Sequence, residues 1–303
     1  MQTRWTGCGT ALVTPFTRTG SLDEATIKRL VRRQIEGGVQ FLVPCGTTGE
    51  SPSLSTAEKL RVVELVVDEA NGKVPVLAGA GSYSTSSAVA LISDMDTIGV
   101  NGILSVTPYY NKPTQEGLYQ HFETIASNTD LPIVVYNVPG RTGCNIDPQT
   151  LLRLSSVPNI VGLKEASGKL EQICEICRIV PEEFCVLSGD DAFTLAVIAL
   201  GGTGVISVVA NELPDQMSEL VSLANAGQFD NARSIHERLL PLMQVNFVES
   251  NPIPVKAAMA ALGLIEETYR LPLVPPSERS RNRITAILKT MELGATVDPS
   301  HES

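Results

Sequence analysis

Short apolar runs recur along the chain about every thirty residues, and amphipathic stretches that open on helix-capping residues follow them. Runs that are apolar on both faces are typical of strands in a parallel sheet covered by helices. The runs predict eight strands, at 10–16, 41–45, 74–80, 102–108, 132–139, 160–166, 184–190 and 204–210. The intervening stretches predict eight helices: 23–36, one from 55, 84–98, 114–127, 147–154, one ending at 179, 192–200 and 214–226.

Eight strand–helix units in about 225 residues predict a (β/α)8 TIM barrel. The alternative is an open doubly wound sheet, which normally carries a glycine-rich dinucleotide loop after its first strand, and Thr14-Pro15-Phe16 is not such a loop. Beyond residue 228 the strand pattern stops and three proline-bounded helices are predicted, at 231–248, 254–262 and 278–291. We therefore predict a catalytic barrel over 1–227, a C-terminal helical region over 228–293 and a disordered tail over 294–303.

Composition narrows the class of protein. The chain has 303 residues, is 43% hydrophobic and 18% charged, and carries a formal net charge of −10. An acidic chain without a basic stripe is not expected to bind nucleic acid. No apolar run reaches the roughly 18 residues of a membrane span, and no apolar signal-peptide core follows the N-terminus. We expect a cytoplasmic protein with no membrane association.

Cysteine and histidine are too sparse to suggest metal chemistry. Of six cysteines, only Cys174 and Cys177 have the C-x-x-C spacing of a redox pair or half a zinc site. Their flanks look helical and no second Cys or His pair lies nearby, so neither role is favoured. With only three histidines, a metal-dependent aldolase or hydrolase is disfavoured. We expect neither a metal nor a cofactor.

A lysine stands at the end of the sixth predicted strand. Lys164 either reaches water from a strand edge or sits in a partly dry pocket, where the neutral amine can attack a carbonyl. The strand pattern alone favours the first reading. Barrel enzymes, however, place their sites at the C-terminal ends of the strands. Those ends also carry hydroxyls, an arginine and two acids, namely Thr47, Thr48, Tyr110, Tyr136, Arg141, Asp190 and Asp191.

Each of these residues alone has a structural explanation. Tyr136 could be a core aromatic and Arg141 a solvated loop residue, and Asp190-Asp191 is more typical of a helix cap than of a metal site. Together, a lysine, hydroxyls and an arginine at one rim would suit a small carbonyl anion. That combination favours Lys164 as a Schiff-base nucleophile.

Three segments closely resemble the dihydrodipicolinate synthase family of pyruvate-dependent class I aldolases, which also includes N-acetylneuraminate lyase. They are Gly46-Thr47-Thr48-Gly49-Glu50, Tyr136-Asn137-Val138-Pro139-Gly140-Arg141-Thr142-Gly143 and Gly162-Leu163-Lys164-Glu165-Ala166. The similarity runs from about Gly9 to Leu273. It implies that pyruvate forms an imine with a lysine and that its enamine attacks aspartate semialdehyde. The product would be 4-hydroxy-tetrahydrodipicolinate, in diaminopimelate and lysine biosynthesis.

The resemblance also implies a role for each matching residue. Lys164 would form the imine, and Thr47, Tyr136 and Tyr110 would relay protons, with Tyr110 supplied by a neighbouring subunit of a homo-oligomer, which the family suggests is a tetramer. Carboxylate binding would fall to Thr48 for pyruvate and Arg141 for the semialdehyde. Main-chain groups of two further residues would line the imine pocket, namely Gly189 and Ile206.

Two alternatives stay open: another aldolase or hydratase of the family, and a catalytically silent barrel that binds an oxo-acid. Thr47 and Arg141 favour the synthase, because lyases of larger sugar acids in the family tend to have serine at the first position and generally lack the arginine.

Many family members are inhibited by lysine at a dimer interface, where lysine-sensitive members carry histidines, an asparagine and a glutamate. The matching residues here are Thr56, Lys59, Tyr83 and Ser87. Lys59 would repel a bound ammonium group and Ser87 supplies no carboxylate. We predict that inhibition by lysine is weak or absent.

Overall fold

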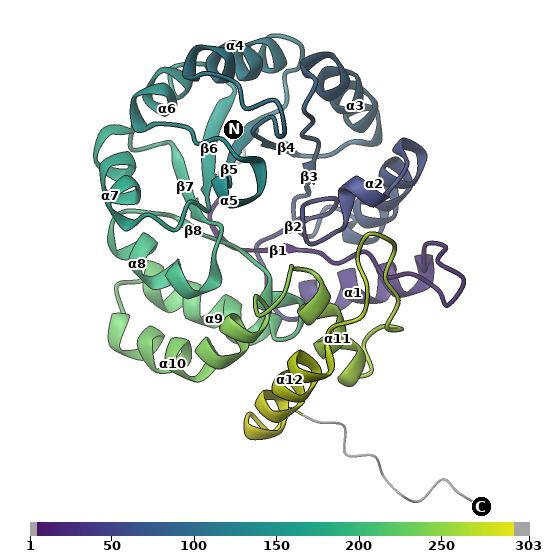
Figure 1. Ribbon diagram of the computed structural model, residues 1–303. Helices are drawn as coiled ribbons and strands as arrows, with labels where there is room; N and C mark the ends of the chain where they lie inside the picture. Colours follow the sequence, from purple (N-terminus) through teal and green to yellow (C-terminus); the bar gives the residue numbers. More distant parts are fainter. Residues whose placement is uncertain (1–4, 294–303) are drawn as a thin grey trace, which may run out of the picture.

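The computed structural model describes residues 5–293, in which eight parallel strands form a barrel enclosed by helices (Figure 1). The strands are hydrogen-bonded in the order β2-β1-β8-β7-β6-β5-β4-β3, and a parallel bridge between Leu42 and Val76 joins the two ends. Their bounds are β1 Gly7–Ala11, β2 Phe41–Val43, β3 Leu77–Gly79, β4 Gly102–Val106, β5 Ile133–Asn137, β6 Ile160–Glu165, β7 Cys185–Ser188 and β8 Gly204–Ser207. The predicted (β/α)8 barrel is confirmed, and the open sheet is wrong.

Helices alternate with the strands and then continue alone. Around the barrel they are α1 Glu24–Glu36, α2 Thr56–Ala70, α3 Thr85–Ile98, α4 Gln115–Ala126, α5 Pro139–Thr142, α6 Pro148–Leu154, α7 Leu170–Ile179, α8 Thr194–Ala199 and α9 Pro214–Asn225. Beyond it lie α10 Phe229–Val245, α11 Ile253–Ala261 and α12 Glu278–Thr290. The turns η1 Ser51–Ser53, η2 Asp191–Phe193 and η3 Val209–Asn211 are 3-10 helices. The short helix α5 was not predicted, because four residues after a Val-Pro junction read as a loop.

Side-chain capping fixes several helix starts. Ser55 and Glu58 form a complete capping box at the start of α2, the helix predicted from residue 55; a serine followed three residues later by a glutamate is the sequence signature of this cap. Asp23, Ser84 and Thr114 each accept a backbone N–H at the start of α1, α3 and α4.

The first strand lies earlier than predicted. The sheet includes Gly7–Ala11, whereas the apolar run that predicted a strand continues to Phe16. Beyond Leu12 the backbone leaves the ladder: the Val13 N–H donates to the Asn211 side chain at 3.1 Å, and Pro15 has no N–H to donate. The run is apolar because it is buried, with Val13 in a cluster with Val255 and Met259 of α11, and burial alone does not distinguish a strand from a buried loop.

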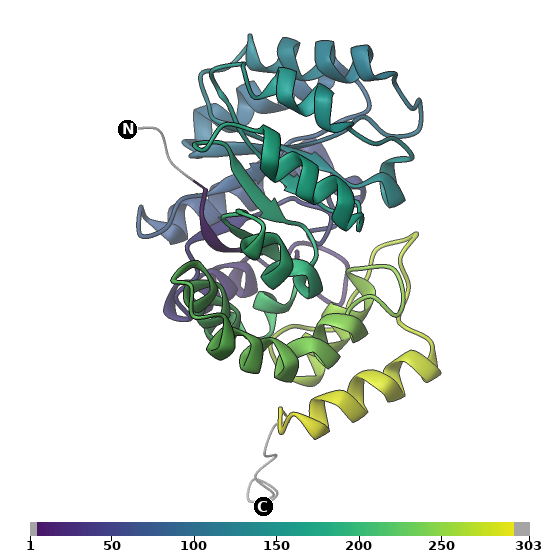
Figure 2. The ribbon, with the colours of Figure 1, turned by 90° about the vertical axis from the view of Figure 1, so that its left-hand side faces the viewer.

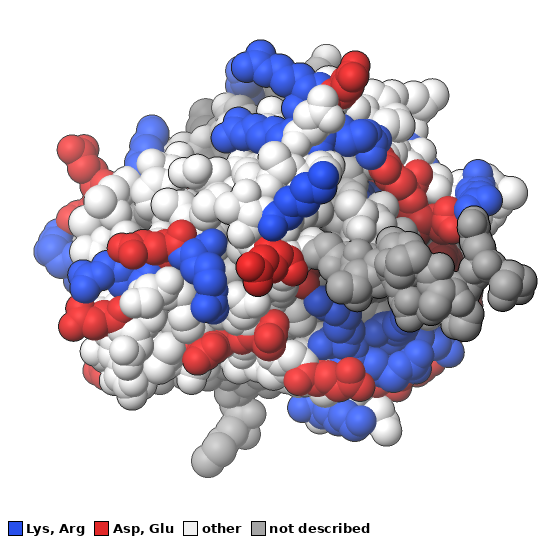
Figure 3. All heavy atoms as spheres, turned by 90° about the horizontal axis from the view of Figure 1, so that it is seen from below, with Lys and Arg blue, Asp and Glu red and all other residues white. Residues whose placement is uncertain are grey.

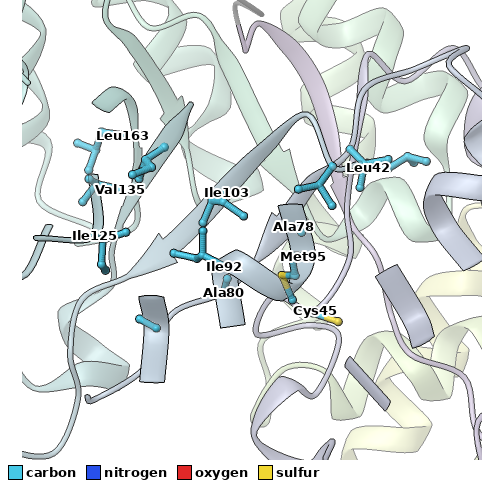
Figure 4. Close-up of a cluster of buried hydrophobic side chains, with 14 of the residues drawn as sticks. Leu42, Cys45, Ala78, Ala80, Ile92, Met95, Ile103, Ile125, Val135 and Leu163 are labelled. Atoms are coloured by element: carbon cyan, nitrogen blue, oxygen red, sulfur yellow. The ribbon is translucent and has the colours of Figure 1, made fainter. Parts of the chain in front are cut away.

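Two layers of apolar packing hold the barrel. The barrel interior is filled by side chains that alternate along each strand, such as Val134 and Tyr136 on β5 with Leu187 and Ile206 on the facing strands. Between the sheet and the helices lies a larger cluster, part of which Figure 4 shows: strand residues point toward side chains of α3 and α4. The labelled members include Leu42, Ile103, Val135 and Leu163 from strands, and Ile92, Met95 and Ile125 from helices.

The helices after the barrel pack onto it and onto each other. In Figures 1 and 2, α10 and α11 lie against one side of the barrel, and α12 packs on α10 and α11 farther from it. One buried cluster joins them to β8 and α9 and includes Val205, Met217, Leu239, Met243 and Ile284. The division at residue 228 into two regions stays a prediction, and the predicted tail 294–303 lies outside the described residues.

The surface mixes both signs of charge. Figure 3 shows Lys and Arg side chains interleaved with Asp and Glu on the face seen from below, without a continuous basic stripe in that view. Across residues 5–293, none of the helices combines the length and the apolar character that crossing a bilayer requires.

Candidate active site

A pocket of about 260 Å³ opens at the C-terminal ends of the strands. Its walls come from β3, β4 and β5 and from the segments that follow β2, β3 and β5, and include Cys45, Gly46, Thr47, Gly79, Gly81, Leu104, Val106, Tyr136, Val138, Arg141 and Thr142. Three of the predicted site residues, Thr47, Tyr136 and Arg141, therefore share one pocket although they are far apart in sequence.

Lys164 lies beside this pocket on β6, paired in register with Tyr136 of β5. Its side chain is 6% exposed, and its Nζ lies 4.3 Å from the centroid of the Tyr136 ring. Burial lowers the pKa of Lys164 to about 7, with Asp191 opposing and Arg141 adding to the shift. The interpretation as a strand-edge lysine that reaches water is wrong, because β6 is hydrogen-bonded on both sides, to β5 and β7.

Gly189 leaves room for this lysine. A Cβ at Gly189 would come within 2.7 Å of the Ala166 Cβ, 3.0 Å of the Glu165 carbonyl oxygen and 3.2 Å of the Lys164 Cε. Ile206, the other residue predicted to line the imine pocket, is buried in the barrel interior in the same cluster as Tyr136. Gly189 thus lies against the Lys164 side chain, whereas the role of Ile206 at the imine stays a prediction.

Tyr136 and Thr47 are hydrogen-bonded side chain to side chain. Burial raises the pKa of Tyr136, while the hydrogen bond with Thr47 and the charge of Arg141 oppose the rise. The phenol is therefore held protonated near neutral pH, next to a lysine of depressed pKa. Such a pair can pass a proton in either direction once a carbonyl oxygen lies between them.

Thr48 and Arg141 are joined through a residue that the sequence did not reveal. The Asn251 Nδ2 donates to the Thr48 Oγ1 at 2.9 Å, and the Asn251 backbone carbonyl accepts from the Arg141 Nη2 at 3.2 Å. Asn251 is 203 residues from Thr48 along the chain. In the sequence, the one feature that pointed to Asn251 was that it begins the Asn251-Pro252-Ile253-Pro254 segment, which lies within the region that resembles the family.

Tyr110 is not brought into the pocket by the single chain. Its side chain is 89% exposed and its backbone has a φ of 72°, in the left-handed region that a bulky residue rarely adopts. The preceding residue, Tyr109, does line the pocket, and its ring meets Tyr83 edge-on at 5.5 Å.

Two buried acids lie close to Lys164, namely Glu165 on the same strand and Asp191 beyond β7; the sequence suggested only a helix cap for Asp191 and no role for Glu165. Asp191 accepts the backbone N–H groups of Val208 and Val209, at 2.9 and 3.0 Å, and so joins the loops after β7 and β8. Glu165 accepts from the Asn137 side chain at 3.0 Å. Burial raises the pKa of both acids.

The neighbouring Asp190 accepts the Ala192 N–H at 2.9 Å, which confirms the predicted helix cap for that residue. The two cysteines with C-x-x-C spacing both lie on α7, where Cys174 is exposed and Cys177 is half-buried. Burial raises the pKa of the Cys177 thiol to about 11. Within residues 5–293 no group of three or more His, Cys, Asp or Glu side chains is arranged to hold a metal ion.

A buried ion pair lies behind the threonine turn. The Lys256 Nζ, on α11, lies 2.6 Å from the Glu50 carboxylate, and neither side chain is exposed to solvent. The same Nζ donates to the Thr14 carbonyl at 3.2 Å and lies over the Phe16 ring. The helical region is thus connected directly to the loop that carries Thr47.

Of the four positions that match the lysine-inhibition site, Lys59 lines the same pocket and the other three are exposed on the surface. Lys59 is half-buried and lines it, together with Ser51, Pro52 and Tyr109. Tyr83 is 58% exposed, and Thr56 and Ser87 are exposed on α2 and α3.

Comparison with known proteins gives one consistent family. The family model described as "Dihydrodipicolinate synthetase family" matches residues 4–291. The 4-hydroxy-tetrahydrodipicolinate synthase of Koribacter versatilis is 53% identical over 282 residues, which cover 93% of this chain and 94% of that protein. Dihydrodipicolinate synthase from Thermotoga maritima superposes with a TM-score of 0.94 at 47% identity, covering 96% of this chain and 100% of that one. A monomeric dihydrodipicolinate synthase variant also superposes with a TM-score of 0.94, at 46% identity, covering 96% of this chain and 98% of that one.

Proposed function

The chain belongs to the dihydrodipicolinate synthetase family, and we propose that it condenses pyruvate with L-aspartate 4-semialdehyde through a Schiff base on Lys164. The product is 4-hydroxy-tetrahydrodipicolinate, on the route to diaminopimelate and lysine. The observation that carries the proposal is a buried lysine of pKa about 7, stacked on a tyrosine beside a pocket that an arginine also lines.

The steps follow from the amine. The neutral Lys164 Nζ attacks the C2 carbonyl of pyruvate, and the oxygen leaves as water, giving an iminium ion. Loss of a methyl proton gives the enamine, which forms a carbon–carbon bond to the semialdehyde carbonyl. The amino group of the semialdehyde portion then displaces the lysine, closing the ring and releasing Lys164. One water is released overall.

The surrounding side chains supply protons and binding. Tyr136 and Thr47, already hydrogen-bonded, relay the protons of imine formation and of the carbon–carbon bond. Thr48 donates to the pyruvate carboxylate, and Arg141, whose planar guanidinium suits a carboxylate, binds that of the semialdehyde. Gly189 and Ile206 line the space around the imine.

The test is borohydride reduction in the presence of pyruvate, followed by peptide mass mapping. The expected result is a pyruvyl adduct on Lys164 that the Lys164→Met variant lacks. No adduct, or an adduct on another lysine, contradicts the proposal. Assays of turnover with aspartate semialdehyde and with other aldehydes then separate the alternatives. Turnover with a different aldehyde but not with aspartate semialdehyde would identify another aldolase. A pyruvate adduct without turnover of any aldehyde would identify a silent oxo-acid-binding barrel.

We further propose that Tyr110 completes the relay of a neighbouring subunit, so that the active form is at least a dimer, and we expect a tetramer. Its 89% exposure outside the pocket of its own chain supports this role. Because one related structure is of a monomeric variant, membership of the family does not fix the oligomeric state.

Mixing two inactive variants tests this proposal. Lys164→Met and Tyr110→Phe subunits, dissociated and reassembled together, should regain activity, because some mixed sites combine an intact Lys164 with an intact Tyr110. A fully active monomer, or no recovery in mixtures shown to contain mixed oligomers, would contradict the role of Tyr110.

Weak or absent inhibition by lysine is proposed on the basis of Lys59. Lys59 stands at a position that matches the inhibition site, and its positive charge would repel the ammonium groups of a bound lysine. Half-inhibition at sub-millimolar lysine would contradict this proposal, and Lys59→His is the variant expected to raise sensitivity.

A cytoplasmic location is proposed as well, because both substrates are intermediates of soluble metabolism. Cell fractionation that finds the chain with membranes or outside the cell would contradict it.

A further inference from the structure

We propose that Asn251 is a positioning residue that fixes the Thr48 hydroxyl as a hydrogen-bond donor toward the carboxylate of pyruvate. The inference rests on the proposed function and adds to it a residue outside the barrel.

The number of hydrogen bonds that a hydroxyl can donate and accept explains why Asn251 would orient Thr48. A threonine hydroxyl has one hydrogen to donate and two lone pairs that accept. The Asn251 Nδ2 donates to the Thr48 Oγ1 at 2.9 Å, and both residues are almost completely buried, at 5% and 2% exposed. Since one lone pair already accepts from Asn251, the hydroxyl hydrogen is directed elsewhere. A donor so directed suits an anion, which can only accept.

Asn251 also contacts the second anion-binding group. Its backbone carbonyl accepts from the Arg141 Nη2 at 3.2 Å. Asn251 thus contacts two anion-binding residues. Its side chain contacts Thr48 in the loop after β2, and its backbone contacts Arg141 on α5. Substituting the side chain should therefore affect the Thr48 contact and leave the Arg141 contact in place.

The threonine turn is held on its other side, so its position relative to Asn251 is fixed. The Thr14 Oγ1 donates to the Gly49 carbonyl at 2.7 Å, and the next residue, Glu50, has a φ of 54° and pairs with Lys256 at 2.6 Å. Asn251 and Lys256 flank the start of α11. One short segment of the helical region therefore holds the turn at two points, Thr48 and Glu50.

A double-mutant cycle tests whether Asn251 acts through Thr48. The variants are Asn251→Leu, which keeps the approximate shape and removes the donor, Thr48→Val, and the double substitution. We expect each single change to raise the pyruvate KM about tenfold or more with a smaller change in kcat. The double variant should be no worse than the more affected single variant, since both changes remove the same interaction.

Two readouts separate positioning from a general structural effect. The KM for aspartate semialdehyde should change less than twofold in Asn251→Leu, because the backbone carbonyl that holds Arg141 remains. Asn246→Leu is the matched control: Asn246 is also fully buried and donates from its side chain to Glu212 at 2.6 Å, away from the pocket, and its loss should lower stability without raising the pyruvate KM. If Asn251→Leu does not fold, Asn251→Ala takes its place in the cycle.

The outcomes divide cleanly. Additive effects of the Asn251 and Thr48 changes, or equal increases in both KM values, overturn this inference while the pyruvate adduct on Lys164 still supports the proposed function. If the unsubstituted protein forms no pyruvate adduct, the proposed function fails and this inference fails with it.

Discussion

The depressed pKa of Lys164 predicts how reaction with pyruvate depends on pH. Only the neutral amine attacks a carbonyl, so the rate follows the neutral fraction of Lys164. Burial lowers the pKa from an ordinary 10.5 to about 7. Activity is therefore expected to fall as the pH decreases through about 7, because the amine becomes protonated there.

The size of the effect follows from that shift. A change from 10.5 to about 7 disfavours the ammonium form by about 5 kcal/mol. Desolvation of a side chain that is 6% exposed outweighs the attraction of the buried Asp191, which favours the charged form, while the Arg141 guanidinium adds to the lowering. At pH 7 about half of Lys164 is neutral, about a thousandfold more than for an ordinary lysine. Between pH 6 and pH 8 the neutral fraction should rise about tenfold and then level off.

The assay is kcat/KM for pyruvate from pH 5.5 to 9 at saturating semialdehyde, because that ratio reports ionisations of the free enzyme. Trapping of the pyruvate adduct on Lys164 with cyanoborohydride over the same range provides a readout that does not depend on turnover. A plateau above pH 8 supports the reasoning. A rate that keeps rising about tenfold per pH unit up to pH 9 would refute it, since that is the behaviour of a solvated lysine. Asp191→Asn should move the midpoint to lower pH.

Three further substitutions have defined consequences. Tyr136→Phe should lower kcat about 10²- to 10⁴-fold with little change in the thermal unfolding temperature, since it removes only the relay hydroxyl; an unchanged kcat would exclude the relay. Gly189→Ala should slow formation of the pyruvate adduct, because its Cβ would lie 3.2 Å from the Lys164 Cε and 2.7 Å from the Ala166 Cβ. Adduct trapping at the rate of the unsubstituted protein would show that the neighbouring side chains move aside to accommodate the methyl group. Lys256→Met should lower the free energy of unfolding in urea by about 3–5 kcal/mol, because it leaves the Glu50 carboxylate buried and unpaired. Adding Glu50→Gln should recover part of that loss, and purely additive losses would show that the two charges are not coupled.

The sequence by itself determined the repeating architecture. Runs apolar on both faces followed by capped amphipathic stretches are local patterns, and eight of them allow few folds other than the barrel. The capping box at Ser55 and the cap at Asp190 were predictable for the same reason, since a cap acts within three residues. The first strand was misplaced because a buried loop and a buried strand have the same composition.

The sequence also indicated which chemistry to look for. Lys164 and Tyr136 were candidates because they end strands, and in a barrel all strand ends meet at one rim. Neither residue could be assigned an ionisation state from its neighbours in sequence. The pKa of Lys164 depends on how completely the folded barrel excludes water from its Nζ and on charges brought in by Asp191 and Arg141.

Only the tertiary structure decided what holds the site in place. Asn251 meets Thr48, and Lys256 meets Glu50, across 203 and 206 residues of chain. No local pattern encodes such contacts, because a buried asparagine or lysine is stabilised by partners that folding brings together from distant segments. The sequence specified the barrel through short-range periodicity, whereas the contacts of Asn251 and Lys256 with the threonine turn exist only once the C-terminal helices have packed against it.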